Sequence, residues 1–171
     1  RTGAPAGARA CTELPPDEAA GDEALHAWLA ACPLREAPLA GRDLSGVRLD
    51  DRDLGRADLR GANLSDARLA GASLYGATLL GARLDGADLT GADLRVADLG
   101  HASLFVADLG SADLRGADLR GAVLTDTNLA NADLAGARLT EAALDAADFT
   151  GARCPDGHRT ERRCADHLVL P

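Results

Sequence analysis

The stretch ADLTGADL at residues 87–94 decides the fold. It contains two copies of a five-residue unit whose central apolar residues are Leu89 and Leu94, each placed two positions after an alanine. From residue 44 to residue 149 the unit occurs 22 times, with Leu at the centre of 21 copies and Phe149 at the centre of the last. Ala stands two residues before the centre in 18 copies, and Gly stands two residues after it in 11. Any fold proposed for this chain must therefore satisfy a period of five residues.

A period of five fits neither an α-helix nor a continuous strand. In a helix five residues advance by about 500°, so the leucines would leave any single face. In a strand an odd period sends successive leucines to opposite faces. A short extended segment followed by a tight turn does satisfy the pattern, because each unit then turns the chain by about 90° and points its leucine inward. Four such units close a coil of about twenty residues, and coils stack through strand-like hydrogen bonds.

These A(D/N)LxG units resemble the pentapeptide-repeat family, over about 115 of the 171 residues. The resemblance implies an all-β solenoid, a right-handed quadrilateral β-helix of about 5–6 coils, with Leu and Ala inside and the other positions facing solvent. Because such a bore is filled by its own side chains, no substrate-sized cavity is expected. The sequence also lacks a nucleophile–base arrangement and a glycine-rich loop before a helix. It therefore predicts no enzyme and no cofactor.

Both ends of a solenoid expose an open hydrogen-bond ladder and need caps. Residues 22–32 (DEALHAWLAAC) predict a short helix that ends before Pro33. Leu25, Trp28 and Leu29 fall at helical spacing, so we expect them to cover the first coil. The predicted organisation is an N-terminal extension with a helical cap, the repeat β-helix and a C-terminal cap, at residues 1–38, 39–153 and 154–171.

Four cysteines, which allow three pairings, flank the array. The rod separates the two ends by far more than the Cα reach of a disulfide, about 7 Å. This leaves the pairs Cys11–Cys32 and Cys154–Cys164, one at each cap. Two disulfides indicate an oxidising compartment, so a periplasmic or secreted bacterial protein is predicted, with a cytoplasmic one as the alternative. The start at Arg1, without a hydrophobic leader, fits either a removed signal peptide or a trimmed chain.

The C-terminal pair has a second interpretation as part of a metal site. Cys154, His158, Cys164 and His167 are residue types that form Cys₂His₂ zinc sites. Their spacings, C-x₃-H and C-x₂-H, match no common zinc finger. A disulfide is therefore predicted here, with zinc as the alternative.

The formal net charge is −9, and within residues 71–153 twelve acids stand against six Arg. This balance argues against direct binding of nucleic acid and against attraction to anionic membranes. No apolar run approaches membrane-spanning length. When the array is folded at twenty residues per coil, one column is acidic and has little Arg beside it: Asp88, Asp108, Asn128 and Asp148. The plain interpretation is that these side chains bond turn backbone.

Three successive units break the turn pattern. The position usually held by Gly or a short polar residue is Val96, His101 and Val106. Outward positions nearby carry larger side chains, namely Tyr75, Leu80, Arg95 and Phe105. Tyr75 lies one coil from Arg95, close enough for a cation–π contact. We expect these seven residues to gather on one flank and to bind a protein partner or a second copy of the chain, with surface drift on a tolerant scaffold as the alternative.

The sequence thus predicts an exported, non-enzymatic interaction or structural module that presents solenoid faces to a protein partner. The resemblance also implies an alternative, a DNA mimic that binds a type II topoisomerase (gyrase) and protects it from quinolones, because some acidic members of the family share the shape and charge of B-DNA. The paired cysteines and the Arg among the Asp favour the first function.

Overall fold

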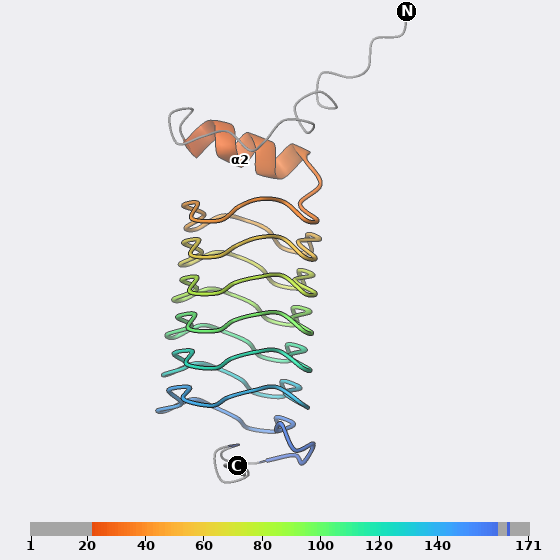
Figure 1. Ribbon diagram of the computed structural model, residues 1–171, viewed down its shortest axis with the longest axis vertical. Coiled ribbons are helices and arrows are strands. Elements are labelled where there is room, and N and C mark those ends of the chain that lie inside the picture. Colours follow the sequence, from red (N-terminus) through yellow and green to blue (C-terminus); the bar gives the residue numbers. More distant parts are fainter. Residues whose placement is uncertain (1–21, 161–163, 165–171) are drawn as a thin grey trace, which may run out of the picture.

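The computed structural model describes residues 22–160 and Cys164. Its one helix in this range, α2 (Asp22–Ala31), lies across one end of a stack of coils (Figure 1). Leu25, Trp28 and Leu29 are buried on the face of α2 that packs into the core of the solenoid. The helix ends near Pro33, which has no N–H to continue it. The predicted helical cap is confirmed, and its length of 10 residues is too short to cross a membrane.

Arg52 explains one departure from the repeat pattern. It stands where most units have an inward Ala, twenty residues after Cys32, which follows the end of α2. Its guanidinium donates to the carbonyl oxygens of Cys32, at 2.7 Å, and Ala30, at 3.4 Å. The last carbonyls of a helix have no partner within the helix, and a cation is favourable there. Arg52 therefore joins the cap to the first coils.

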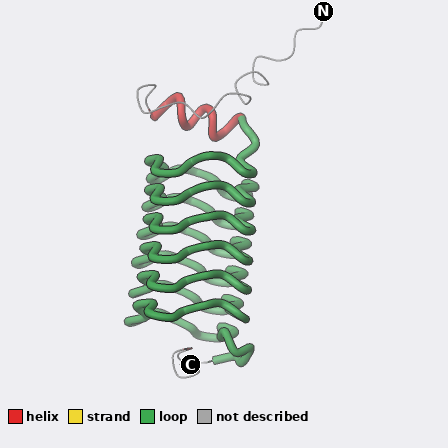
Figure 2. The backbone as a smooth tube through the Cα atoms, in the orientation of Figure 1, coloured by secondary structure: helices red, strands yellow, loops and turns green. Residues whose placement is uncertain are grey.

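The coils stack in a register of twenty residues. Parallel single-residue bridges join each such pair, from Pro38 with Asp58 to Asp133 with Arg153. The central Leu of one coil donates its N–H to the next coil, and the residue before the Leu donates to the previous coil, so each face is tied in both directions. Figure 2 shows these coils as loops and turns, because each face contributes only one bridging residue per coil.

The corners are tight turns closed by a hydrogen bond from the Ala N–H to the C=O of the Leu three residues earlier. From residue 36 to residue 151, every fifth residue has a positive φ at the corner. Half of these 24 positions are glycines, which adopt this left-handed backbone without steric cost. The other half are not, and they include Val96 (φ 56°) and Val106 (φ 58°). A β-branched side chain in this region is strained.

The interior is filled by two side chains from each unit, the central Leu and the Ala two residues before it. The central leucines from Leu54 to Leu134 and nearly all the inward alanines are fully buried. Among the described residues the one buried polar side chain is Thr127, whose hydroxyl donates to the carbonyl oxygen of Leu104 at 2.7 Å. The bore is therefore closed to ligands along its length.

At the far end the chain folds back on itself. Arg153 forms an antiparallel bridge with Arg159, and the N–H of Cys154 donates to the carbonyl oxygen of His158 at 2.7 Å. This hairpin occupies hydrogen-bonding groups that a further coil would otherwise take. The predicted boundaries 1–38, 39–153 and 154–171 stay a prediction, because most of both outer segments lies outside the described residues.

Replacing Val96 with Gly should raise the free energy of unfolding by about 1 kcal/mol, because the strain of the left-handed turn exceeds the entropy that Gly adds to the unfolded chain. The matched control is Val123→Gly, at a position without positive φ, which should lower it by roughly 0.5–1 kcal/mol. Urea unfolding of both variants measures the difference. Changes of the same sign would contradict the strain assigned to Val96.

Candidate functional site

The solenoid has four faces, which we name after the central leucines of successive units: the Leu99, Leu104, Leu109 and Leu114 faces. Each face continues into a corner, where the next unit begins. Residues twenty apart lie in one column along the rod. Any set of residues five apart therefore lies on successive faces, a quarter-turn apart.

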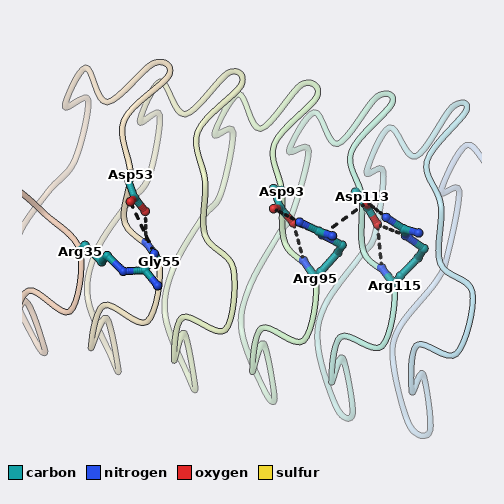
Figure 3. A network of polar contacts seen from close by, with 7 residues as sticks. All are labelled: Arg35, Asp53, Gly55, Asp93, Arg95, Asp113 and Arg115. Carbon is teal, nitrogen blue, oxygen red and sulfur yellow. Dashed lines mark hydrogen bonds and ion pairs between the residues drawn. The ribbon is translucent and has the colours of Figure 1, made fainter.

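On the Leu114 face the carboxylates are held by arginines from the same turn. Arg95 donates to both oxygens of Asp93 at 2.8 Å, and Arg115 does the same to Asp113 at 2.8 and 2.6 Å (Figure 3). Arg95 also lies 3.7 Å from Asp113, and Arg115 lies 4.0 Å from Asp133, so the pairs form a ladder along the rod. The guanidinium hydrogen bonds are the main cause that lowers the pKa of Asp93 and Asp113.

The ladder ends on an aromatic ring. The guanidinium carbon of Arg95 lies 5.4 Å from the centroid of the Tyr75 ring, one coil earlier. The predicted cation–π contact is confirmed.

The Leu99 face repeats this arrangement. Arg60 binds both oxygens of Asp58, and Arg120 binds those of Asp118. The pKa of each aspartate is lowered, first by the hydrogen bonds from its arginine. These arginines neutralise their aspartates locally, whereas Asp98 on the Leu99 face is followed by Gly100 and accepts a hydrogen bond from its N–H at 3.0 Å.

On the Leu109 face no Arg stands two residues after the aspartates, and the arginines of its column, Arg48 and Arg68, lie on the coils before Asp88. The carboxylates of this face accept hydrogen bonds from backbone N–H groups instead: Thr90 to Asp88 at 3.0 Å, Gly110 to Asp108 at 2.8 Å, and Thr150 to Asp148 at 2.9 Å. Asn128 also donates its side-chain amide to Asp108, at 2.9 Å. The predicted column is thus observed, and its contacts with turn backbone are those of the plain interpretation.

The acidity extends beyond this column to both corners. We call the acidic face the Leu109 face with its two corners, in four segments: 85–91, 105–111, 125–131 and 145–151. These segments hold six Asp and no Arg. The remainder of residues 71–153 holds six acids and six Arg, so the formal charge of −6 in this range belongs to the acidic face. One member, Asp85, pairs at 3.5 Å with Arg83 of the neighbouring Leu104 face.

Sequence reasoning found the central column but missed the corner carboxylates Asp85, Asp126 and Asp145. The signal was present, because counting acids and arginines by their place in the twenty-residue coil separates the faces. The missing step was to count the corner positions together with the central ones.

The seven residues predicted to form one flank are exposed, except for the half-buried Arg95, but do not lie together. Val96, His101 and Val106 occupy three successive corners, because they are five residues apart. Tyr75 and Arg95 share the corner of Val96, Leu80 that of His101, and Phe105 that of Val106. The expectation of a single flank is wrong for this reason: its members span half the circumference of the rod.

A groove of about 450 Å³ lies at the corner of His101. It opens where Gly100 lacks a side chain between Leu80 and Arg120. Both arginines that line it, Arg120 and Arg138, pair with Asp118, at 2.5 and 3.6 Å. The groove therefore offers neither a free cationic pocket nor an apolar one.

Cys154 and Cys164 form a disulfide with a Cα–Cα distance of 5.2 Å. Cys32 is also disulfide-bonded, while Cys11, its predicted partner, lies outside the described residues. Within residues 22–160 and Cys164 no three His, Cys, Asp or Glu side chains group as metal ligands. The zinc alternative also needs His167, which lies outside these residues.

Acid should destabilise the protein below about pH 4, because carboxyls with lowered pKa in the folded state favour folding only while they are ionised. This stabilisation is fully present above the ordinary pKa of Asp and is lost as the pH falls through the lowered values. Arg115→Gln should flatten this loss, since Asp113 would then titrate nearer its ordinary range. Urea unfolding between about pH 2 and pH 6 checks it.

The matched control is Arg56→Gln, which removes an exposed arginine that lies 3.8 Å from Glu36. It should leave the slope of stability against pH unchanged. Equal slopes for Arg115→Gln and the unmodified protein would contradict the role assigned to the ladder.

Comparison with known proteins identifies the repeat. The model of the Pentapeptide repeats family matches eight copies, at residues 43–81, 67–104, 82–121, 102–140 and 117–153. No curated protein matches the chain.

Solved structures of this family are also similar. A pentapeptide repeat protein from the cyanobacterium Cyanothece 51142 is 31% identical over 63% of this chain and 83% of that one, with a TM-score of 0.38. HetL from the cyanobacterium Nostoc sp. strain PCC 7120, involved in heterocyst differentiation regulation, is 37% identical over 75% of each chain, with a TM-score of 0.26. QnrB1, a plasmid-mediated fluoroquinolone resistance protein, is 24% identical over 71% of this chain and 66% of its own, with a TM-score of 0.36. The chain belongs to the pentapeptide repeat family, whose fold is the right-handed quadrilateral β-helix.

Proposed function

We propose that this protein is a non-enzymatic interaction module whose acidic face binds a basic surface of a protein partner. The observation that carries this proposal is the segregation of charge: the acidic face holds six Asp without an Arg, while the other faces are neutral. Such a field attracts basic surfaces and repels nucleic acid and anionic lipid.

The geometry of the carboxylates supports the same function. Asp88, Asp108 and Asp148 are held by hydrogen bonds from turn N–H groups two residues later. A partner therefore meets acceptors that are already ordered, and little side-chain entropy is lost on binding. Gly, Ala, Ser and Thr stand beside these carboxylates, and the large exposed apolar side chains of the acidic face are confined to one corner, at Phe105 and Val106. The rest of the face is low in relief and admits a broad partner.

The acidic face should bind a fluorescent oligoarginine peptide, and the triple variant Asp88→Asn, Asp108→Asn, Asp148→Asn should bind it roughly tenfold more weakly. This follows from about 0.5 kcal/mol for each exposed charge pair. Fluorescence anisotropy at low and at physiological salt measures both affinities, and the salt dependence should fall with the charge.

The control variant carries Asp98→Asn, Asp133→Asn and Glu141→Gln, which remove the same charge from the other faces. It should retain most of the affinity. Equal losses in the two variants would show that net charge alone matters, and would sink the assignment to the acidic face.

The acidic column also favours a second candidate, the DNA mimic that binds gyrase. Its carboxylates Asp88, Asp108 and Asp148 lie on coils spaced by about 4.8 Å along the rod, with Asn128 between the last two, and form a row of fixed negative charges. The paired arginines on two other faces count against it, because a DNA surface is negative all round. A gyrase supercoiling assay with and without quinolone distinguishes the two. Protection at micromolar protein would favour the mimic, and its absence would remove this candidate.

We further propose that the protein is exported. The Cys154–Cys164 disulfide and the bonded Cys32 support an oxidising compartment, periplasmic or extracellular. Protein isolated from its native host should contain two disulfides and no free thiol by mass spectrometry after alkylation. Alkylated cysteines in that sample would favour the cytoplasmic alternative.

A further inference from the structure

We infer that one corner of the acidic face, where it meets the Leu104 face, is the apolar half of one binding surface, and that its partner is a basic amphipathic helix. The apolar corner consists of Phe105, Val106 and Val123. This inference rests on the proposed function, because it names the kind of basic partner that the acidic face takes.

The three side chains are exposed and close to one another along the rod. They are 46%, 52% and 38% exposed, respectively. Phe105 and Val106 form the corner between the Leu104 and Leu109 faces. Val123 bridges Ser103 on the Leu104 face, which makes it the diagonal neighbour of Phe105 in the next coil. A solvent-exposed cluster of this kind gains stability only when something covers it.

The backbone conformation of Val106 costs conformational free energy that packing within the solenoid does not offset. Its φ of 58° is the left-handed conformation that glycine occupies in half of the turns. A valine here is strained, and since half of it is exposed, it gains little packing in return. Gly would suit the turn better, so the side chain is of use outside the solenoid.

Carboxylates surround the apolar corner. Asp126 occupies the same corner position as Val106 one coil later, and Asp108 follows two residues along the chain. Neither forms an ion pair with another described residue. A helix that places an apolar residue on Phe105 and Val106 therefore brings its flanking basic residues to unneutralised acids. The corner of Val96 differs, because Arg95 and its paired aspartates lie beside it.

The backbone of the solenoid favours a helix over an added strand. Around the apolar corner the N–H groups are already bonded: Val106 to Thr125, Asp108 to Ala87 and Asp126 to Asp145. With no free edge here, a partner must bind through side chains. A helix rises about 5.4 Å per turn, near the coil spacing of about 4.8 Å, so a helix parallel to the rod sets one turn against each coil.

Two peptides of identical composition test the inference. One arranges Leu and Arg so that an amphipathic helix forms, and the other is a scrambled order without a helical stripe. By fluorescence anisotropy the first should bind at least tenfold more tightly. The variants Phe105→Ala and Val106→Gly should reduce its affinity to that of the scrambled peptide and leave the scrambled peptide unaffected. Val106→Gly also relieves the strained turn, so its melting temperature should not fall, and lost binding cannot then be ascribed to unfolding.

The matched control is the pair Tyr75→Ala and Val96→Gly, which changes the opposite corner in the same way and should leave both affinities unchanged. Equal binding of the two peptides, with both lost in the triple Asp→Asn variant, would overturn the inference while the proposed function stands. If neither peptide binds, both this inference and the proposed function would be overturned. If the protein dimerises, Val106→Gly abolishes the dimer and the two peptides bind equally, the inference of a helical partner would be overturned. The apolar corner would then be assigned to a second copy of the chain.

Discussion

The structure depends on one repeated constraint: every fifth residue must hold a left-handed turn while the leucine before it points inward. The turn closes through a hydrogen bond from the Ala N–H to the Leu C=O, and it sets the angle at which the next face begins. Because four such corners return the chain to its starting column, each coil hydrogen-bonds to the next at a separation of twenty residues. The interior packing, the faces and the columns all follow from that register.

Because Leu and Ala fill the interior of the solenoid, a partner can bind only to its outer surface. The outward positions are then free to differ from face to face, since they contribute little to the core. On two faces an Arg two residues after an Asp folds back and binds it, which neutralises the surface. On the acidic face Gly or Thr stands in that place, so the carboxylates accept hydrogen bonds from neutral groups: backbone N–H groups, the amide of Asn128 and the hydroxyl of Thr150. The choice at a single position per unit therefore decides the charge of a whole face.

The ends show how the same chain stops the stacking. At the first coils α2 covers the open end with Leu25, Trp28 and Leu29, and Arg52 leaves the inward pattern to bind the carbonyls that end the helix. At the other end the chain reverses after Arg153, and the returning segment pairs with the last coil through the antiparallel bridge of Arg153 with Arg159. Both devices cover open edges that would otherwise pair with another chain.

The amino-acid sequence by itself determined the solenoid, the filled bore, the helical cap and the pairing of Cys154 with Cys164, because each follows from a local period or from the length of the rod. It also placed Tyr75 next to Arg95. Counting places in the twenty-residue coil also assigns the corner acids to the acidic face and the exposed apolar residues to three corners. The sequence did not show that Arg52 binds the cap, or that Arg95 and Arg115 each bind both oxygens of an aspartate. Those contacts depend on the direction of each side chain, which is fixed only when the coils close and hydrogen-bond in register.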